Sequence, residues 1–577
     1  MRRVQSRTCA RKCFYLATGL VLALAVRASA ESPRDELLRM VPDDAGFCLL
    51  VDDIRGHAAR LADSPFVRQF HESPMGALLN ADPDWQLLKA GREKVEAVLG
   101  LDWTKFRDDL LGDAVVFAYR PSAPADPPRD QVLILLRARD QEALAKLVER
   151  INAFQKVSGE IQGVEPRERG GQRYFQRLGA KAAPFYALVG PLLAVASDEA
   201  LLREALDRRS RETASEPPLA RRFRELLGTE RRLASLWVNP RAFDSAVAAK
   251  AEQGNDQQRA IAKSFLTYWK ALDAAALGVG LQDDLTCTLA LRARMERLPP
   301  AARRFFAEAA KPSDLWRQFP DNAMFAFAGR FDASAFEEML GEFLTPATRR
   351  AFRDGLDRYV GAALDMDVIA DVLPCLGPDF GGCITASADG KSWPPEFLFA
   401  LGVRPGDKLP HVDKALFSAL NALAQAAVID HNAKHAERMV LKTVLQDKIE
   451  VKYLAGGAGL PPGLQPAFAL KDGYLVLASS PEAVGRFSLR SARPAESEVP
   501  LLRVSFTGLR RYLDAHRPEI AAALAGQNKS TPAEVEKQLD AMLLGLQAFD
   551  RLEISQRTVE GQVALTVRVR PTLSLRK

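Results

Sequence analysis

Apolar and polar positions alternate along the strand-like segments of this chain. In residues 563–570, VALTVRVR, Val563, Leu565, Val567 and Val569 point one way, and the alanine, threonine and arginine positions between them point the other. Residues 285–294, LTCTLALRAR, alternate in the same manner. A period of two is typical of a strand with one face on a core and the other facing water or a partner. The pattern therefore predicts sheets with helices packed on one face.

Further elements can be predicted along the first half of the chain. Strands are expected at 45–51, 114–119, 131–138 and 234–238, on both sides of Gly190, and in a hairpin that turns at 282–284. Helical patterns cover the 60s to about 110, residues 141–154, a stretch from Asp198 and a long stretch to about 270. Short turns between neighbouring strands favour antiparallel pairing, so the predicted class is α+β.

Four blocks of sequence recur in the same order in the second half. The pairs are 37–51 with 315–329, 133–144 with 398–409, 185–201 with 468–484, and 285–294 with 561–570. In the first pair, LLRMVPDDAGFCLLV and LWRQFPDNAMFAFAG share the leucine, arginine, proline, aspartate, alanine and phenylalanine at matching positions. The sequence thus predicts two tandem homologous domains, each a mainly antiparallel sheet with helices packed on one face.

The domain boundaries follow from this repeat. A chain of 577 residues is too long for one hydrophobic core, since single cores stop growing near ~250–300 residues. Prolines and an Ala- and Arg-rich segment between the copies indicate a short linking helix. The predicted parts are a signal peptide (1–30), copy one (31–297), a linker (298–312), copy two (313–572) and a tail (573–577).

The first 30 residues have the pattern of a secretory signal peptide. A basic start precedes the apolar run FYLATGLVLALAV, and Ala28-Ser29-Ala30 supplies small residues before Glu31. The apolar run is shorter than the ~20 residues that a membrane-spanning helix needs. Cleavage is expected between Ala30 and Glu31, which leaves the export route open between the general and twin-arginine pathways. The mature chain is expected in the periplasm or outside the cell, with no membrane span.

The net charge of the chain lies in this leader. The full chain has a formal net charge of +6, and the leader carries six cations and no acidic residue. The mature chain is therefore neutral, which disfavours a nucleic-acid partner and a basic membrane-binding face.

The mature chain has four cysteines. Cys48 and Cys287 lie within apolar runs, where a buried free thiol is expected. Cys375 and Cys383 are close enough in sequence for a disulfide in an oxidising compartment. We keep that bridge as a possible site feature.

No catalytic motif stands out. His431 and His435 could share one face of a helix and hold a metal, but Asn432 replaces the glutamate of a zinc hydrolase and no third ligand is evident. Gly-x-Ser-x-Gly is absent. The sequence therefore gives no catalytic residue, no cofactor and no confirmed metal site. Because 73 acidic residues always allow a carboxylate pair somewhere, an exported hydrolase with a carboxylate-based site in one copy is the alternative function.

Several short motifs suggest a family. They are the Pro-Asp-Asp/Asn-Ala-x-Phe segments 42–47 and 320–325, the Leu-Gly-Asp of 111–113, and a Phe-x-x-x-x-Gly hairpin that ends in Ala-Ser-x-x-Glu-Ala at 468–483. With the leader, the chain resembles a group of bacterial exported proteins classed as a domain of unknown function, here in two tandem copies. The resemblance implies an extracytoplasmic location and no known activity. The favoured function is an exported, non-enzymatic envelope protein with a binding or structural role, whose unknown protein or small-molecule ligand lies between the copies.

Overall fold

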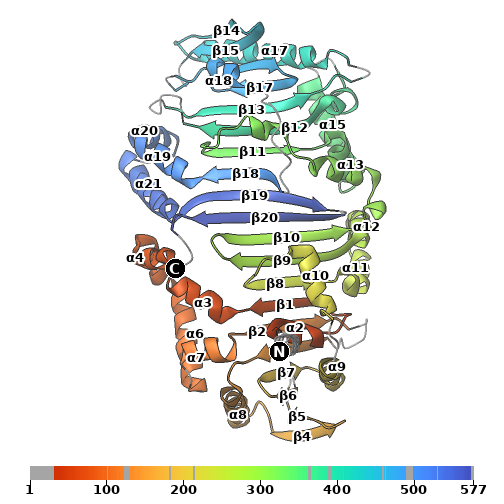
Figure 1. The fold of residues 1–577 in the computed structure, drawn as a ribbon. Helices are drawn as coiled ribbons and strands as arrows, with labels where there is room; N and C mark the ends of the chain where they lie inside the picture. The colour runs from red at the N-terminus through yellow and green to blue at the C-terminus, as the bar shows by residue number, and fades with distance from the viewer. Residues whose placement is uncertain are drawn as a thin grey trace, which may run out of the picture.

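The structure is a computed structural model that describes residues 32–573, except for gaps at 101, 123–129, 181–183, 212–214, 362–365, 387–392, 407–408, 458–459, 462, 489–497, 529–530 and 560. The predicted signal peptide and its cleavage site between Ala30 and Glu31 lie outside the described residues. The described chain is α+β and forms one 20-stranded sheet whose strand pairs are all antiparallel (Figure 1).

The first ten strands form one half of the sheet. In the order in which they pair, they are β4 (Gly163–Arg169), β5 (Gln172–Leu178), β6 (Phe185–Val189), β7 (Leu192–Ala196), β3 (Gln131–Arg137), β2 (Ala114–Arg120), β1 (Phe47–Asp52), β8 (Ala234–Val238), β9 (Leu272–Leu281) and β10 (Leu285–Ala293).

The second ten strands pair in the same order. They are β14 (Met439–Gln446), β15 (Ile449–Gly456), β16 (Ala467–Lys471), β17 (Tyr474–Ala478), β13 (Glu396–Val403), β12 (Leu376–Thr385), β11 (Phe325–Arg330), β18 (Val499–Ser505), β19 (Phe549–Val559) and β20 (Gln562–Pro571). The four recurring sequence blocks thus supply β1 and β11, β3 and β13, β6–β7 and β16–β17, and β10 and β20, which hold equivalent places in the two halves.

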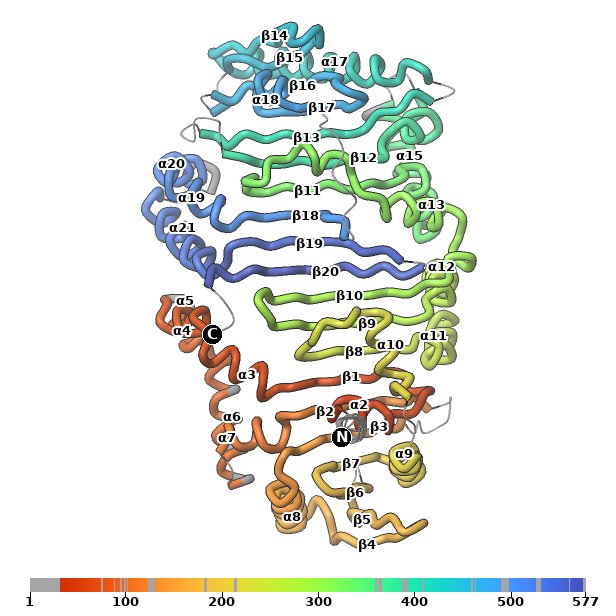
Figure 2. Tube along the Cα trace, in the orientation of Figure 1, coloured from red at the N-terminus to blue at the C-terminus, as the bar shows by residue number. Residues whose placement is uncertain are grey.

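The two halves meet where β10 pairs with β20 (Figure 2). Leu289 lies opposite Leu565, and these are the equivalent residues of the matched blocks. Thr288 and Thr566 share a hydrogen bond of 3.2 Å across the seam. The sequence predicts a sheet in each domain, whereas the structure has one sheet. The reason is that the last strand of each half would otherwise leave its backbone groups unpaired at an edge.

Helices connect the strands. In the first half they are α2 (Pro33–Met40), α3 (Ile54–Ala62), α4 (Pro65–Glu72), α5 (Pro74–Ala81), α6 (Pro83–Leu99), α7 (Trp103–Lys105), η1 (Phe106–Leu110), α8 (Gln141–Val157), α9 (Glu199–Ser210), α10 (Pro218–Leu227), η2 (Pro240–Phe243), α11 (Asp244–Ala251), α12 (Asp256–Ala271) and η3 (Met295–Arg297). In the second half they are α13 (Pro300–Ala309), η4 (Asp314–Arg317), α14 (Ala333–Gly341), α15 (Pro346–Leu356), η5 (Asp357–Gly361), η6 (Val368–Val372), η7 (Leu373–Cys375), α17 (Val412–Lys434), α18 (Pro481–Arg486), α19 (Phe506–Ala515), α20 (Arg517–Asn528) and α21 (Pro532–Gln547).

The core lies on one face of the sheet. In the first half, α2, α9 and α10 cover small and apolar side chains such as Leu50 and Ala290. In the second half, η4 and α18 cover the equivalent face. The outer strands differ from the expectation of helices on one face only, because Leu144 of α8 packs with Leu193 of β7, and α17 packs with Leu475 of β17, on the opposite side. These side chains alternate with the core positions of their strands.

A largely buried ion cluster joins four elements of the second half. Arg330 of β11 pairs with Glu308 of α13 (2.5 Å) and with Asp379 of β12 (3.4 Å). Tyr474 of β17 donates its hydroxyl to Asp379 (3.2 Å), and Lys311 pairs with Glu308 (2.6 Å). The predicted linker thus contains the expected helix, α13, and this helix is anchored to the sheet by Glu308.

Candidate functional site

Among the described residues, no helix covers one side of the central strands. Along β9, Ala274 and Ala276 face the core, and Leu277, which follows Ala276, faces away and is 37% exposed. On β10, Ala290 is buried, whereas Leu289 and Leu291 are about 40% exposed (42% and 39%). Large apolar side chains at this exposure in the middle of a sheet are unusual for a soluble protein, which rarely leaves a contiguous apolar patch uncovered.

The partly and fully exposed side chains on this side form a row across the first half and the seam. Each residue of this row lies directly opposite the next on the neighbouring strand. The row is Ile134, Phe117, Leu49, Leu236, Leu277, Leu289 and Leu565.

A second row starts in the first half and runs far into the second. It is Leu281, Leu285, Val569, Leu552, Val504, Phe325, Ile384 and Phe397. We call the two rows together the open face, and the second one the seam-crossing row. Neighbouring strands lie ~4.8 Å apart, so the side chains of each row form a continuous apolar path perpendicular to the strands.

The chemistry of the open face is that of an apolar surface. Both rows consist of aliphatic and aromatic side chains, and the backbone groups of their strands are used in the ladder hydrogen bonds of the sheet. A ligand on the open face would therefore gain from burial of apolar area, at roughly 25 cal/mol per Å², and would find few hydrogen-bond partners.

Helices lie at both ends of the central strands (Figure 1). On one side, α12 of the first half contacts the second half, since Tyr268 donates its hydroxyl to the Glu342 carboxylate (2.9 Å) and Ser264 donates to the Glu342 backbone carbonyl (2.8 Å). On the other side, Phe66 of α4 contacts Phe549 of β19, with ring centroids 5.9 Å apart. The two halves are thus joined by helix contacts at both strand ends as well as by the seam.

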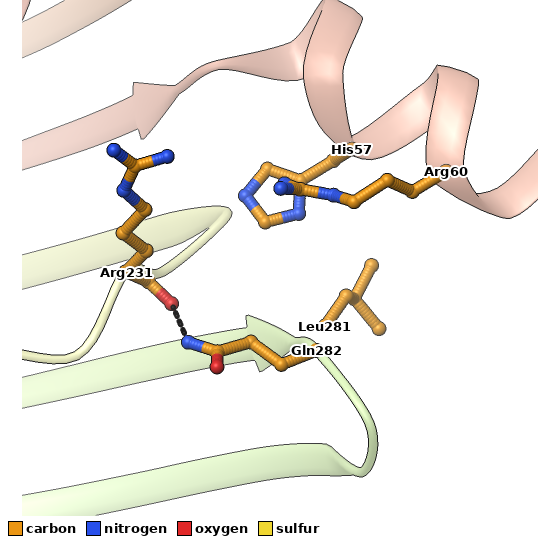
Figure 3. Close-up of a pocket in the computed structure, with 5 residues that line it drawn as sticks. All are labelled: His57, Arg60, Arg231, Leu281 and Gln282. Atoms are coloured by element: carbon orange, nitrogen blue, oxygen red, sulfur yellow. Dashed lines mark hydrogen bonds between the residues drawn. The ribbon is translucent and has the colours of Figure 1, made fainter. Parts of the chain in front are cut away.

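A cationic pocket lies at one edge of the open face, where α3 meets the end of β9 (Figure 3). Its volume is about 390 Å³, within the range of small-molecule sites. His57, Arg60, Arg231, Leu281 and Gln282 line it. Leu281 is also the first residue of the seam-crossing row, so the pocket and the open face share a wall.

Local structure fixes the pocket residues. Asp53 caps α3 by accepting a hydrogen bond from the Gly56 backbone N–H (3.0 Å), which places His57 and Arg60 on the first turns of the helix. On the opposite side, Gln282 donates its side-chain amide to the Arg231 backbone carbonyl (3.1 Å) and ties the β9 turn to the loop before β8.

The polar groups of the pocket have unused hydrogen-bonding capacity. His57 is 3% exposed, and its buried Nδ1 has no hydrogen-bond partner in the described part of the chain. Burial lowers the pKa of His57 below its ordinary value, and the nearby Arg60 guanidinium lowers this pKa further. Arg60 lies 3.7 Å from the Asp53 carboxylate, which is a loose ion pair. The donors that the pocket presents are therefore the guanidinium groups of Arg60 and Arg231.

The helix of the second half that is equivalent to α3 differs at the position of His57. Asp332 caps α14 as Asp53 caps α3, and the residue four positions after each cap is Phe336 in α14 and His57 in α3. Sequence reasoning missed the pocket, because its residues come from three distant segments that only the pairing of β8, β9 and β1 brings together.

Asp52 lies at the end of β1, near the pocket, and the pKa of its carboxyl group is shifted. Burial raises its pKa to about 6, although Arg34 and Arg231 act in the opposite direction. A carboxylate-based hydrolase calls for a pair of carboxyl groups with displaced pKa values. The hydrolase alternative stays a prediction.

The Asp52 shift predicts a pH-dependent stability. Since the folded-state pKa exceeds the ordinary value of 3.8, the native state binds the proton more tightly, and this contribution is present below about pH 4 and lost as the pH rises through about 6. Asp52→Asn is expected to raise the free energy of unfolding by about 2–3 kcal/mol at pH 7.5 and to leave it unchanged at pH 3.5. Urea titrations across this range measure the effect. Asp207→Asn, at an exposed carboxylate, serves as the control, and an equal gain there or no gain at Asp52 would contradict the assignment.

The two predicted metal-ligand candidates lie together at a helix end. His431 and His435 stack with ring centroids 4.5 Å apart, and the His431 ring nitrogen Nε2 lies 3.1 Å from the Glu437 backbone carbonyl. Within the described ranges, no group of three or more His, Cys, Asp and Glu side chains could hold a metal. The two histidines thus lie at the C-terminal end of α17, without a third ligand among the described residues.

The suggested bridge between Cys375 and Cys383 is not formed, because both are free thiols. Cys375 ends η7 and Cys383 lies in β12, and the strand between them advances by ~3.3 Å per residue. This separation exceeds the ~7 Å Cα limit of a disulfide. The two cysteines also belong to different hydrophobic clusters. Burial raises the pKa of both thiols, that of Cys383 to about 12.

Thiol labelling tests this placement. In the native 31–577 protein, only Cys287, which is partly exposed beside the open face, is expected to react rapidly with a chromogenic disulfide reagent. After denaturation without reductant, all four cysteines are expected to react. Two reactive thiols instead of four would contradict the free-thiol assignment.

The long helix α17 meets the length and composition of a membrane-crossing helix. It packs on the outer strands of the second half, where Phe417 contacts Phe468 of β16 with ring centroids 5.5 Å apart. The expectation that the mature chain has no membrane span remains a prediction.

No family model, curated protein or solved structure matches this chain. The resemblance to exported bacterial proteins therefore stays a prediction, and the function has to be inferred from the open face and its cationic pocket.

Proposed function

We propose that this chain is an exported, non-enzymatic envelope protein that binds the apolar chain of an amphiphilic small molecule on its open face. The observation that carries the proposal is the uninterrupted seam-crossing row, from Leu281 in the first half to Phe397 in the second. A row of this length without a hydrogen-bonding side chain suits a hydrocarbon chain.

The lack of polar groups favours a hydrocarbon over a protein partner. Protein interfaces carry about one hydrogen bond per 100–200 Å² and a polar rim. The two rows of the open face offer no donors or acceptors from their side chains, and their backbone groups are already paired. An alkyl chain needs no hydrogen-bond partners, and each of its methylenes contributes up to ~0.8 kcal/mol to the binding free energy when it is buried.

We infer that the two halves arose by duplication, in support of the tandem-copy interpretation. The matched blocks 285–294 and 561–570 supply β10 and β20, and the other three pairs of blocks also hold equivalent places in the sheet order. A duplication that keeps the strand pattern and joins the halves edge to edge doubles the length of apolar face available to one ligand. The leader supports the assignment to the envelope.

Native mass spectrometry of the 31–577 protein, purified gently from its own host's envelope, tests the proposal. We expect a monomer with a reproducible excess mass that becomes a free apolar small molecule on denaturation. Sedimentation measurements on the same sample distinguish a ligand from a second copy on the open face. A stable dimer without excess mass, or a ligand-free monomer that takes up no alkyl chain when one is supplied, would overturn the proposal.

A further inference from the structure

The cationic pocket and the seam-crossing row are one continuous surface, because Leu281 belongs to both. An apolar row that ends at guanidinium groups has the polarity of an amphiphile with an acidic head. Resting on the proposed function, we propose that the pocket binds the anionic head group of the ligand, with Arg60 and Arg231 as its cationic contacts, while the acyl chain lies along the seam-crossing row.

The donors of the pocket match a carboxylate or a phosphate. A guanidinium offers a planar fork of N–H donors that binds two oxygens of either group, and such charge-assisted hydrogen bonds are stronger than neutral ones. Arg60 and Arg231 face each other from α3 and the loop before β8 (Figure 3). His57 adds no donor for the anion, because its lowered pKa favours the neutral ring, whose single N–H bonds to the Leu281 backbone.

The charges already present leave room for an anion. Asp53 faces Arg60, but at 3.7 Å it leaves most of the guanidinium donors open. Asp52 lies near Arg231, and burial keeps its carboxyl partly protonated near pH 6, with its pKa at about 6. Arg231 has no ion pair among the residues that the structure describes. An incoming anion therefore meets two guanidiniums that the protein itself only partly neutralises.

The position of the pocket gives the ligand a direction. The cations lie at the start of the row in the first half, and Phe336 stands at the equivalent helix position in the second. A chain anchored by its head at Arg60 and Arg231 would thus run over Leu285 and Val569 across the seam. One such ligand is expected per protein chain.

The test compares two probes that differ only in charge. Fluorescence titration of the 31–577 protein at pH 6 with cis-parinaric acid and with its methyl ester measures the contribution of the head group. We expect the acid to bind at least about tenfold more tightly than the ester, as a charge-assisted contact would give. In Arg60→Gln/Arg231→Gln, the acid is expected to fall to the affinity of the ester, and the ester to bind as before. The double variant Arg169→Gln/Arg350→Gln, which removes two exposed arginines elsewhere, is expected to keep the preference.

The outcomes separate this inference from the proposed function. Equal binding of acid and ester to the unmodified protein would overturn the head-group assignment and leave the apolar site standing. Failure of both probes to bind would overturn the proposed function as well. If the control variant lost the preference for the acid to the same extent, the preference would come from net charge, and the assignment of the head group to the pocket would be overturned. Inorganic phosphate is expected to displace the acid only weakly, because it lacks the chain. Displacement of the acid by phosphate at micromolar concentration would identify a free-anion site instead.

Discussion

Leu285→Asp is expected to abolish binding of the uncharged methyl ester of cis-parinaric acid, with a loss of at least about 100-fold in affinity. Leu285 lies in the seam-crossing row, between Leu281 and Val569 on the neighbouring strands. A carboxylate there would have to lose its water for an alkyl chain to bind, and uncompensated burial of a charge costs several kcal/mol. Fluorescence titration measures the affinity.

The same substitution should leave the fold intact. Leu285 is already 38% exposed, so its aspartate would remain hydrated in the free protein. Circular dichroism and the melting temperature are expected to change little. Val157→Asp, at the 89% exposed end of α8, makes the same chemical change away from the open face and should bind the ester normally. Normal binding by Leu285→Asp would remove the seam-crossing row from the binding site.

Arg330→Met is expected to lower the free energy of unfolding by about 3–5 kcal/mol, the cost of removing one partner from a buried ion cluster. The side chains of Arg330, Glu308 and Asp379 are 13%, 17% and 7% exposed. The methionine would fill much of the space but leave two carboxylates in the cluster with only Lys311 and Tyr474 as partners. Urea unfolding at pH 7.5 measures the loss.

Arg304→Met provides a matched comparison on α13, the helix that carries Glu308. Arg304 pairs with Glu338 at 2.8 Å, but both side chains are nearly half exposed (47% and 49%), so a loss of less than about 1 kcal/mol is expected. Equal losses in the two variants would show that the cluster contributes no more than a surface ion pair.

The same cluster should make stability fall in acid. Burial raises the pKa of Glu308, but the hydrogen bonds from Lys311 and Arg330 outweigh it and hold the pKa below the ordinary value. A lowered folded-state pKa stabilises the native state above the unfolded pKa, and this contribution is lost as the pH falls. Arg330→Met should therefore also weaken the acid dependence of unfolding.

Local sequence patterns were sufficient for many elements of the fold. Residues 234–238 form β8 as predicted, and the helix predicted from Asp198 is α9, with Asp198 as its cap. The hairpin β4–β5 was not predicted, because GVEPRER carries charges and a proline where strand patterns are usually read. Its position at the edge of the sheet explains this composition, since edge strands commonly carry charges and proline.

The candidate site could be predicted only in part. The alternation in 285–294 indicates that Leu289 and Leu291 share a face, but not whether that face meets helices, water or a ligand. Which of these three applies depends on the tertiary structure, in which β10 pairs with β20 and this face stays open. The cationic pocket depends on the register of β1, β8 and β9, which brings Arg231 to His57, and no local pattern encodes this meeting.

The seam between β10 and β20 also determines how far the sheet can grow. Because equivalent residues, Leu289 and Leu565, lie opposite each other, the join has the self-complementary geometry of a twofold dimer interface, which is isologous. An isologous join consumes the same edge on both sides and leaves no copy of that edge for another unit. The pairing that lengthens the apolar path thus also limits the assembly to two halves, where a head-to-tail join would permit an open-ended array.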